Sequence, residues 1–342
     1  MGKLRVVIIG LGVIGREQLK AFQHLDNVDV VGGYDADKEV AQRVCQEFGI
    51  RSLRSVEEGV DPDVTDAVSV CTPEGLHVSP ALMAIEAGQH VLIEKPLASS
   101  REDAQKLLRA ARASDRSVVM VGQTLRFDPY YLAARKLLMG GAVGRVNHVS
   151  ARRSNSITNA LRTRGRTSVS LFLGVHDLDF CHWVLQSRAA RVYAVGVKGT
   201  LSREYGYDVA DTVLGTIEFE AGSCAGVEFS WCLPLEGVDV LDAHFEVMGD
   251  EGQLAVYRQQ ERLVVTSRKA QKAEEIDVSE VGGVDIRVGG LDREVAAFVE
   301  AVGTGAAPPV GIEDGYIAML SSLAMDESAK KGEIVVPAYE DR

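Results

Sequence analysis

The stretch LRVVIIGLGVIGREQLKAFQHLDNVDVVGGYD, residues 4–35, decides the fold of the N-terminal part of the chain. Its apolar run Val6–Ile9 is short, β-branched and uninterrupted, which is typical of a strand buried on both faces. Gly10, Gly12 and Gly15 follow it at G-x-G-x-x-G spacing. Glycines at this spacing permit a tight turn, the close approach of a pyrophosphate to the backbone, and close packing of a helix on the strand.

A helix and a second strand complete this pattern. Arg16–His24 is the predicted helix, and its N-terminal amides can hold a diphosphate. The second strand is Val28–Val31, and Asp35 follows it, twenty residues after Gly15. A carboxylate there can accept hydrogen bonds from both hydroxyls of an adenosine ribose and would repel a 2′-phosphate, so we expect NAD rather than NADP. The cofactor contacts expected from this stretch are Gly10, Gly12, Val13, Ile14, Gly15 and Asp35. The alternative is a glycine turn in an unrelated α/β unit, with Asp35 as a surface acid.

Length and composition fit a globular protein with two domains. The chain has 342 residues, 46% of them hydrophobic and 25% charged, and a chain of this length exceeds one typical hydrophobic core. Its net charge of −12 argues against binding to nucleic acid or to an anionic membrane surface. No apolar run reaches the length of a membrane span, and the first strand begins near the N-terminus, so we expect no signal peptide and a cytoplasmic protein. The five cysteines form no C-x-x-C pair, which favours reduced thiols.

Strands and helices continue to alternate as far as residue 121. This alternation predicts a doubly wound parallel sheet, in which ligands bind at the carboxyl ends of the strands. The further predicted strands are Arg51–Leu53, Asp66–Val70, His90–Ile93 and Ser117–Val121. Three segments that fall at the ends of such strands are Cys71–Pro73, Glu94–Pro96 and Gln123. We therefore expect them to gather, with the glycine loop and Asp35, along one edge of the sheet.

Beyond residue 125 strands dominate. Seven strands are predicted between Val146 and Ser267, interrupted by a helix at Val175–Leu185. The charge-rich segment Arg268–Glu275 is predicted to be a solvated loop or a hairpin tip. We predict a dinucleotide-binding domain at 1–124 and, at 125–342, an α+β domain built on an open, mostly antiparallel sheet. An uncovered sheet face of this size usually meets a partner, so we expect a homo-oligomer, a dimer or a tetramer.

Motifs spread over nearly the whole chain resemble those of the Gfo/Idh/MocA oxidoreductases. They are Gly10–Gly15, Cys71-Thr72-Pro73 with His77, Glu94-Lys95-Pro96, Arg126-Phe127-Asp128-Pro129, Gly174–Asp179 and the helix around Asp314-Gly315. The resemblance implies an N-terminal Rossmann domain, a C-terminal α+β domain with an open sheet, and NAD(P)-linked oxidation of a sugar or cyclitol hydroxyl. It also implies association through the sheet face. The further cofactor contacts that we expect are Cys71, Thr72, Pro73, His77, Glu94, Lys95 and Gln123.

The oxidation of a hydroxyl requires a base within hydrogen-bond reach of its oxygen. The resemblance supplies Lys95, which is also unusual as a lysine placed directly after the apolar run Val91–Ile93. Burial and the nicotinamide cation would lower its pKa toward neutrality. His176 begins the helix Val175–Leu185 and could share the proton transfer or bind the same oxygen. Asp179 lies three residues further on the same helical face and could orient the imidazole. The alternatives are a snorkelling strand-end lysine, a capping histidine and a packing acid.

One position departs from the family pattern. Inositol dehydrogenases of this family carry an aspartate four residues before the catalytic histidine, and here that position is Phe172. The lysine–aspartate–histidine set is therefore incomplete. This argues against simple myo-inositol dehydrogenase activity and predicts a different substrate contact at Phe172.

The charge distribution suggests the character of the substrate. Residues 129–176 contain no Asp or Glu but eight Lys and Arg side chains. Arginine suits bidentate capture of a carboxylate or phosphate, so we expect a polyhydroxylated and anionic small molecule. The expected substrate contacts are Lys95, Arg152, Arg164, Arg166, Phe172 and His176. The alternative is a surface or subunit-contact patch.

Other chemistries find less support in the sequence. The seven histidines show no H-x-x-x-H or H-E-x-x-H spacing, so we expect no metal site. Two other functions remain open beside the dehydrogenase. One is a lyase or glycosidase that oxidises its substrate transiently and returns the hydride; the other is a non-catalytic NAD-binding sensor. The presence of both Lys95 and His176 argues against the sensor, which needs no proton relay.

Overall fold

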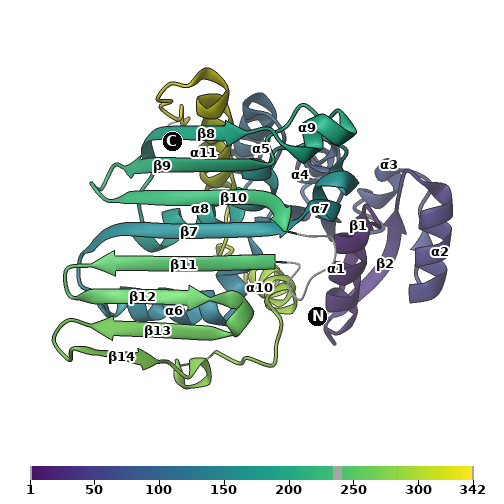
Figure 1. The fold of residues 1–342 in the computed structure, drawn as a ribbon. Helices are drawn as coiled ribbons and strands as arrows, with labels where there is room; N and C mark the ends of the chain where they lie inside the picture. The colour runs from purple at the N-terminus through teal and green to yellow at the C-terminus, as the bar shows by residue number, and fades with distance from the viewer. Residues whose placement is uncertain (1, 234–240, 283, 341–342) are drawn as a thin grey trace. The chain divides into compact units, whose positions relative to one another are not determined.

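Two units make up the chain, and the computed structural model describes residues 2–233, 241–282 and 284–340 of it. The first unit comprises Met1–Thr124 and Val288–Tyr316, and the second comprises Leu125–Arg287 and Ile317–Arg342. Figure 1 shows the elements of both units, which are described here one at a time.

The division differs from the predicted one because the C-terminal part of the chain, assigned wholly to the domain 125–342, returns to the first unit at Val288–Tyr316. Helix α10, Gly290–Thr304, packs on α1, Val13–Gln23. The rings of Phe22 and Phe298 meet edge to face at 6.3 Å. The Val121 amide also donates a hydrogen bond to the Val310 carbonyl. Periodicity reveals that a helix exists, but not the core on which it packs.

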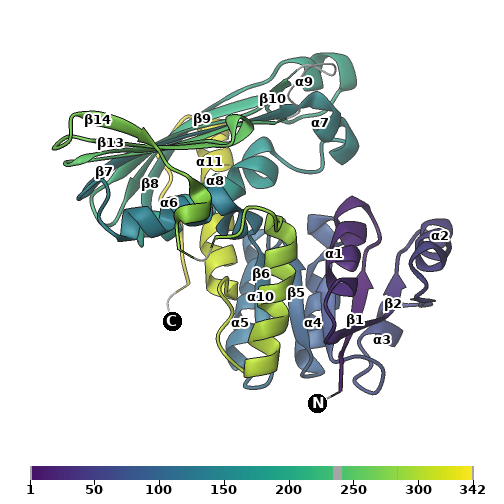
Figure 2. The same ribbon diagram turned by 90° about the horizontal axis from the view of Figure 1, so that it is seen from below.

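The first unit is built on a six-stranded parallel sheet with the order β3-β2-β1-β4-β5-β6, which confirms the predicted doubly wound fold. The strands are β1 Leu4–Ile9, β2 Val28–Tyr34, β3 Arg51–Ser52, β4 Ala67–Val70, β5 His90–Glu94 and β6 Val119–Gly122. The other helices are α2 Lys38–Phe48, α3 Val56–Gly59, α4 Val78–Glu86 and α5 Arg101–Ala113. Helix α1 packs against α10 and α4 against α5 (Figure 2). Val6–Ile9 of β1 is fully buried, as expected of a central parallel strand.

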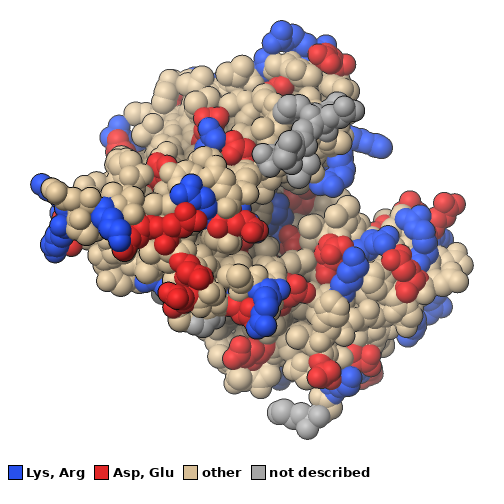
Figure 3. All heavy atoms as spheres, turned by 60° about the horizontal axis from the view of Figure 1, so that its bottom comes forward, with Lys and Arg blue, Asp and Glu red and all other residues tan. Residues whose placement is uncertain are grey.

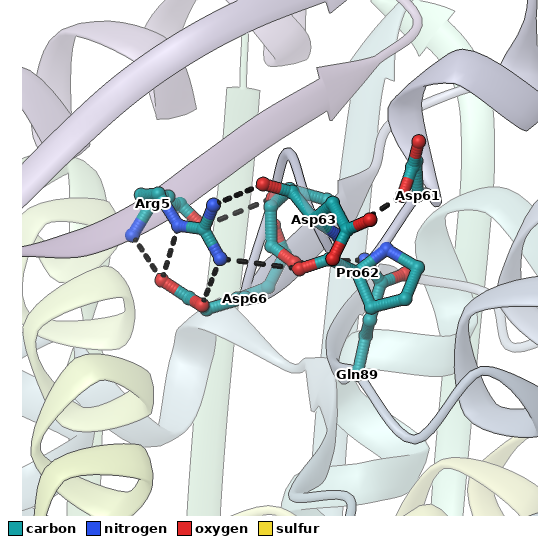
Figure 4. Close-up of polar contacts among 8 residues, drawn as sticks. Arg5, Asp61, Pro62, Asp63, Asp66 and Gln89 are labelled. Carbon is teal, nitrogen blue, oxygen red and sulfur yellow. Dashed lines mark hydrogen bonds and ion pairs between the residues drawn. The ribbon is translucent and has the colours of Figure 1, made fainter.

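At the amino ends of the strands, Arg5 connects β1 with the segment that precedes β4 (Figure 4). Its guanidinium donates to both carboxylate oxygens of Asp66, from Nε at 3.1 Å and from Nη2 at 2.7 Å. The same guanidinium donates to the carbonyls of Asp63 and Pro62. The hydrogen bonds from Arg5 are the largest cause of the lowered pKa of Asp66. This clamp lies at the opposite ends of the strands from the predicted cofactor edge.

The second unit contains an eight-stranded sheet with the order β14-β13-β12-β11-β7-β10-β9-β8. Neighbouring strands are antiparallel, except that β7 and β10 run parallel. The strands are β7 Val146–Ser156, β8 Ala189–Val197, β9 Thr212–Phe219, β10 Cys224–Leu233, β11 Leu241–Gly249, β12 Gly252–Tyr257, β13 Arg262–Ser267 and β14 Lys272–Glu275. The helices are α6 Pro129–Met139, α7 Ile157–Thr163, α8 Val175–Leu185, α9 Thr200–Tyr205 and α11 Ile312–Lys331, the last of which begins in the first unit.

Among the described residues, the helices that pack on this sheet cover one of its faces. Helix α6 packs on β12 and β13, and α8 packs on β7, behind the sheet as Figure 1 draws it. Their side chains form the core, where the Phe180 ring meets the rings of Tyr131 at 4.9 Å and Phe245 at 4.7 Å. The opposite face leaves large apolar side chains exposed, with Val195 at 49% and Leu214 at 47%. The predicted open, mostly antiparallel sheet is confirmed.

Strand β14 forms one edge of the sheet and was not predicted as a strand. Only Arg268–Gln271 is the expected hairpin turn, since Lys272–Glu275 pairs antiparallel with β13. All four residues of β14 are exposed, so no apolar alternation marks it in the sequence. Charged side chains protect a free sheet edge from pairing with other chains. Figure 3, in which this side comes forward, shows acidic and basic side chains interspersed.

The Arg5 clamp predicts an acid-sensitive contribution to stability. At neutral pH, replacing Asp66 with Asn should lower the free energy of unfolding by about 0.5 to 1 kcal/mol, since both side chains are over a third exposed and solvent screens such pairs. The folded-state pKa of Asp66 is depressed, so this contribution is present above the unfolded pKa near 3.9 and is lost as pH falls through the folded pKa. Thermal unfolding from pH 7 to pH 3 should show the two proteins converge; a difference independent of pH would contradict the assignment.

Candidate active site

The glycine loop of the first unit has the backbone geometry that a bound diphosphate requires. Gly10 has a φ of +96°, and a Cβ there would lie 2.7 Å from the backbone of Cys71 and Thr72. A Cβ on Gly15 would lie 1.9 Å from the Gly10 carbonyl oxygen. A Cβ on Gly12 meets nothing within 4 Å, and no side chain caps the N-terminus of α1 at this residue. The amides that begin α1 are therefore available to an anion.

The first turn of α1 also presents Val13 and Ile14, which are 59% and 44% exposed. Exposed apolar side chains beside a row of amides suit the face of a dinucleotide. The sequence predicted both residues as cofactor contacts, and they lie on the open side of the loop.

Asp35 lies at the end of β2, next to the glycine loop. One carboxylate oxygen accepts a hydrogen bond from the Leu11 amide at 2.8 Å, and the other accepts one from the Asp37 amide at 2.9 Å. These bonds fix the carboxylate, and each oxygen keeps a second lone pair. Each carboxylate oxygen of Asp35 thus retains an acceptor site for a further donor.

His77 joins two of the strand-end segments. Its Nε2 lies 2.7 Å from the Thr72 carbonyl and its Nδ1 lies 2.9 Å from the Pro96 carbonyl. The side chain is 1% exposed, and burial lowers the pKa of the imidazole. Both ring nitrogens face protein carbonyls, so the imidazole lies between the Cys71–Pro73 and Glu94–Pro96 segments, and the neutral ring donates a hydrogen bond to one of the two carbonyls.

Buried side-chain atoms of Gln123 and Thr72 at this edge have no hydrogen-bond partner among the described residues. The Gln123 side chain is 1% exposed. Neither its amide oxygen nor its amide nitrogen has a hydrogen-bond partner among the described residues, and the same holds for Thr72 Oγ1. Leaving such groups unpaired is costly. The residues of the first unit therefore fit NAD, with hydrogen-bonding groups in place beyond the diphosphate loop.

Lys95 directly follows β5 and is half-buried. Its backbone amide donates to Glu94 Oε2 at 3.1 Å, and Glu94 Oε1 accepts a hydrogen bond from Gln18 Nε2 at 2.6 Å. The lysine thus lies at the carboxyl end of β5, in the same row of strand ends as Cys71–Pro73 and Gln123, as the sequence predicted.

In the second unit, a π-helical turn at Ser170–Gly174 leads into α8. Gly174 is required there, because a Cβ would lie 2.5 Å from the Phe229 ring. Phe172, on the π-helical turn, is half-buried and places its ring 5.3 Å from that of Trp231. His176 lies at the start of α8 and is half-buried. Position 172, where the resemblance to inositol dehydrogenases led us to expect an aspartate, therefore holds an apolar ring beside an aromatic neighbour.

Two buried ion pairs fix α8. Asp179 binds Arg126 in bidentate fashion, at 2.7 and 2.8 Å, and Asp177 binds Arg153 at 2.6 and 3.0 Å. All four side chains are at most 5% exposed. Removing one partner of such a pair costs about 3 to 5 kcal/mol, because the other charge is left buried and unpaired. Asp179, predicted to orient His176, is thus engaged by Arg126, a partner that sequence spacing did not reveal.

Acidic side chains pair with some of the arginines of the segment 129–176 in the folded protein. Besides the buried Arg153–Asp177 pair, Arg152 on β7 donates to Asp242 on β11 at 2.6 Å. Arg166 donates from Nε to the Thr163 carbonyl, and Arg164 ends α7 with a φ of +53°. Neither Arg164 nor Arg166 has an acidic partner among residues 2–233, 241–282 and 284–340. Acids from outside the segment therefore neutralise two of its arginines.

The described part of the chain contains no group of three or more His, Cys, Asp and Glu side chains placed to hold a metal ion. No helix within it is long and apolar enough to span a membrane.

Comparison with known proteins agrees with this geometry over nearly the full length of the chain. Residues 4–123 match the Gfo/Idh/MocA oxidoreductase family with its NAD-binding Rossmann fold, and residues 131–255 match the C-terminal domain of the same family. Inositol 2-dehydrogenase of Acidothermus cellulolyticus is 29% identical over 96% of this chain and 93% of its own length. 1,5-Anhydro-D-fructose reductase of Ensifer adhaerens is 30% identical over 95% of this chain and 96% of its own.

Solved structures share the fold. An oxidoreductase domain protein from Kribbella flavida superposes with a TM-score of 0.90 at 22% identity and covers 99% of this chain and 100% of its own. Levoglucosan dehydrogenase in complex with NADH and levoglucosan superposes with a TM-score of 0.88 at 23% identity and covers 98% of this chain and 100% of its own.

The position of Asp35 predicts the coenzyme preference. Wild-type protein should bind NADH at least tenfold more tightly than NADPH, because the carboxylate accepts from the ribose hydroxyls and repels a 2′-phosphate. Asp35→Ser should reduce this difference between the affinities for NADH and NADPH. Asp37→Ser is the matched control, since it removes a charge two residues away while a hydroxyl can still cap α2. Calorimetric titration with both coenzymes measures the ratio. A preference for NADPH in the wild type would refute the role of Asp35.

Proposed function

Because the chain belongs to the Gfo/Idh/MocA oxidoreductase family, we propose that it is a dehydrogenase that oxidises a secondary hydroxyl of a polyhydroxylated small molecule with NAD. The substrate classes are sugars, sugar acids, nucleotide sugars and cyclitols. The relatives named inositol 2-dehydrogenase and 1,5-anhydro-D-fructose reductase support this range. The observation that carries the proposal is the position of Lys95 at the carboxyl end of β5, in the same row of strand ends as the glycine loop and Gln123.

The bound nicotinamide would supply the hydride acceptor. The chain itself must hold the hydroxyl and receive its proton. Lys95 is proposed as the general base in oxidation and the general acid in reduction. His176 is proposed to bind or relay the same proton, with α8 held in place by the Arg126–Asp179 and Arg153–Asp177 pairs. Asp179 then contributes to the position of the helix that carries His176.

The substrate contacts differ from those of simple inositol dehydrogenases at Phe172, whose ring packs near Trp231. An apolar ring removes a negative charge that would repel an anion. Arg164 and Arg166 are the remaining candidates for an anionic substrate group, since Arg152 and Arg153 are paired with acids. Each charge-assisted contact is worth roughly 1.5 to 3 kcal/mol.

A screen of neutral sugars, sugar acids and cyclitols with NAD and NADP, following reduced nicotinamide, tests the proposed reaction. A sugar acid as the best substrate, with a raised KM in Arg164→Met or Arg166→Met, would support the anionic assignment. Turnover without net NADH would instead identify a lyase or glycosidase with transient oxidation. Binding without turnover of any substrate would contradict the enzymatic assignment.

Substitution of Lys95 separates catalysis from binding. Lys95→Ala should lose about two or more orders of magnitude in kcat, because general acid–base catalysis contributes typically about 10² to 10⁴, with coenzyme binding largely retained. His176→Ala should lose less. Lys106→Ala, an exposed lysine on α5, is the matched control. Steady-state kinetics and coenzyme titration provide both readouts, and near-normal turnover by Lys95→Ala would exclude the lysine as the base.

We also propose a homo-oligomer that associates through the open face of the eight-stranded sheet. Tyr193, Val195 and Val197 on β8 and Leu214 on β9 are 45 to 52% exposed there. Val195 and Leu214 are cross-strand neighbours. Contiguous exposed apolar surface of this kind usually marks an interface.

The double variant Val195→Glu/Leu214→Glu should dissociate this oligomer, since it places two charges in an apolar contact. Met139→Glu, at a 48% exposed position on α6 and thus away from the open face, should leave the assembly intact. Light scattering at micromolar concentration gives the mass of each protein. A monomeric wild type would refute the association.

A further inference from the structure

Two buried glutamates meet over Gly122 in the first unit. Glu94 ends β5 and is paired in register with Gly122, the last residue of β6, while Glu294 comes from α10. The residues are 7% and 0% exposed. A Cβ on Gly122 would lie 3.3 Å from Glu294 Oε1 and 3.4 Å from Glu94 Oε1. One oxygen of each glutamate therefore lies against the same backbone position at Gly122.

The hydrogen-bond donors around the pair are unevenly divided. Glu94 accepts at both oxygens, from Gln18 Nε2 at 2.6 Å and from the Lys95 amide at 3.1 Å. The Gln18 amide is oriented by Ser69, whose hydroxyl donates to Gln18 Oε1 at 2.5 Å. Gln18 must therefore present its NH₂ group to Glu94. A carboxyl that accepts at both oxygens is best accommodated in its ionised form.

Glu294 has the opposite arrangement. Its Oε2 accepts a hydrogen bond from Thr124 Oγ1 at 3.0 Å. Its Oε1 is buried, lies against Gly122 on the side of Glu94, and has no hydrogen-bond partner among the described residues. A proton on this oxygen would remove the charge that the site does not otherwise solvate.

The net effect of the surroundings is to raise the pKa of both carboxyls. Burial is the largest cause of the raised pKa of Glu294, and the nearby charge of Glu94 raises it further, while Thr124 and Lys95 oppose the shift. Burial also raises the pKa of Glu94, against the opposing effects of Lys95 and Gln18. The other titratable neighbour is the Cys71 thiol, whose pKa is raised by burial and by both carboxyls. With one proton on the pair, two glutamates and the Lys95 ammonium are together neutral.

Building on the dehydrogenase chemistry proposed above, we propose that Glu294 carries a proton at neutral pH beside an ionised Glu94, and that it is a positioning residue whose ionisation sets the proton affinity of Lys95. While Glu294 is neutral, the pair presents a single negative charge, that of Glu94, to Lys95, which can release its own proton after each turnover. Once Glu294 ionises at higher pH, the second negative charge stabilises the ammonium form and opposes the action of Lys95 as a base.

Thermal unfolding of the full chain without coenzyme tests the proton on Glu294. A carboxyl with a raised folded-state pKa binds more protons when folded, so the fold loses stability as pH rises from the unfolded pKa near 4.3 through the folded pKa. Glu294→Gln mimics the protonated acid and removes this loss. We expect the melting temperature of Glu294→Gln, relative to wild type, to rise by about 3 °C or more between pH 5 and pH 9.

Glu300→Gln is the matched control, because it makes the same change at an exposed position on α10, and its difference from wild type should not vary with pH. Thr124→Val provides a second test that keeps both carboxyls. It removes the donor to Glu294 Oε2, which stabilises the ionised carboxyl. The melting temperature of Thr124→Val should therefore fall relative to that of wild type as pH rises. A pH-independent difference for both Glu294→Gln and Thr124→Val would overturn the assigned proton.

The pH profile of kcat/KM for oxidation tests the influence on Lys95. Glu294→Gln should move the ascending limb to lower pH by about half to one unit, because in the wild type Glu294 ionises within the pH range of this limb and its negative charge then holds the proton on Lys95. The KM for NAD should change less than threefold. An ascending limb at the same pH in Glu294→Gln and in wild type would overturn the positioning role of Glu294. If the wild type oxidises no polyol, the proposed function fails, and the unfolding experiment still decides whether Glu294 holds the proton.

Discussion

The contact between Gly15 and the Gly10 carbonyl is the constraint on which the first unit depends. With only 1.9 Å between a hypothetical Cβ and that oxygen, no other residue lets α1 begin so close to the end of β1. This closeness brings unpaired helix amides to the carboxyl edge of the sheet. Asp35, Gln123 and Lys95 lie at the same edge, because the carboxyl ends of all the parallel strands meet there.

The second unit obtains its rigidity by a different route. Helix α8 is buried over most of its surface and carries two buried aspartates, Asp177 and Asp179. Arg126 and Arg153 neutralise them from distant segments, with geometry that arginine supplies better than lysine because its guanidinium binds both carboxylate oxygens at once. Buried pairs of this kind contribute little net stability but strongly penalise any arrangement that separates them. They fix the helix at whose start His176 lies.

The pairing of Glu94 with Glu294 brings β5 and α10, which are 200 residues apart in the sequence, to the end of β6. A lysine that acts as a base near neutral pH needs neighbours that do not hold its proton too tightly. Two ionised carboxylates would do so, whereas one ionised and one protonated carboxyl leave a single charge. Gly122 makes the arrangement possible, since it gives both carboxyls access to the end of β6.

The sequence by itself determined the parallel sheet, the glycine loop, Asp35, the strand-end position of Lys95 and the helix that begins near His176. These features follow from local period, β-branching and glycine spacing, which act over a few residues. Only the tertiary structure decided the partners of the charged groups. Asp179 faces Arg126, Arg152 faces Asp242, and Glu294 faces Glu94, across separations of 53 to 200 residues. Electrostatic pairing depends on distance in space, and no sequence period encodes which distant segment will supply the opposite charge or the second carboxyl.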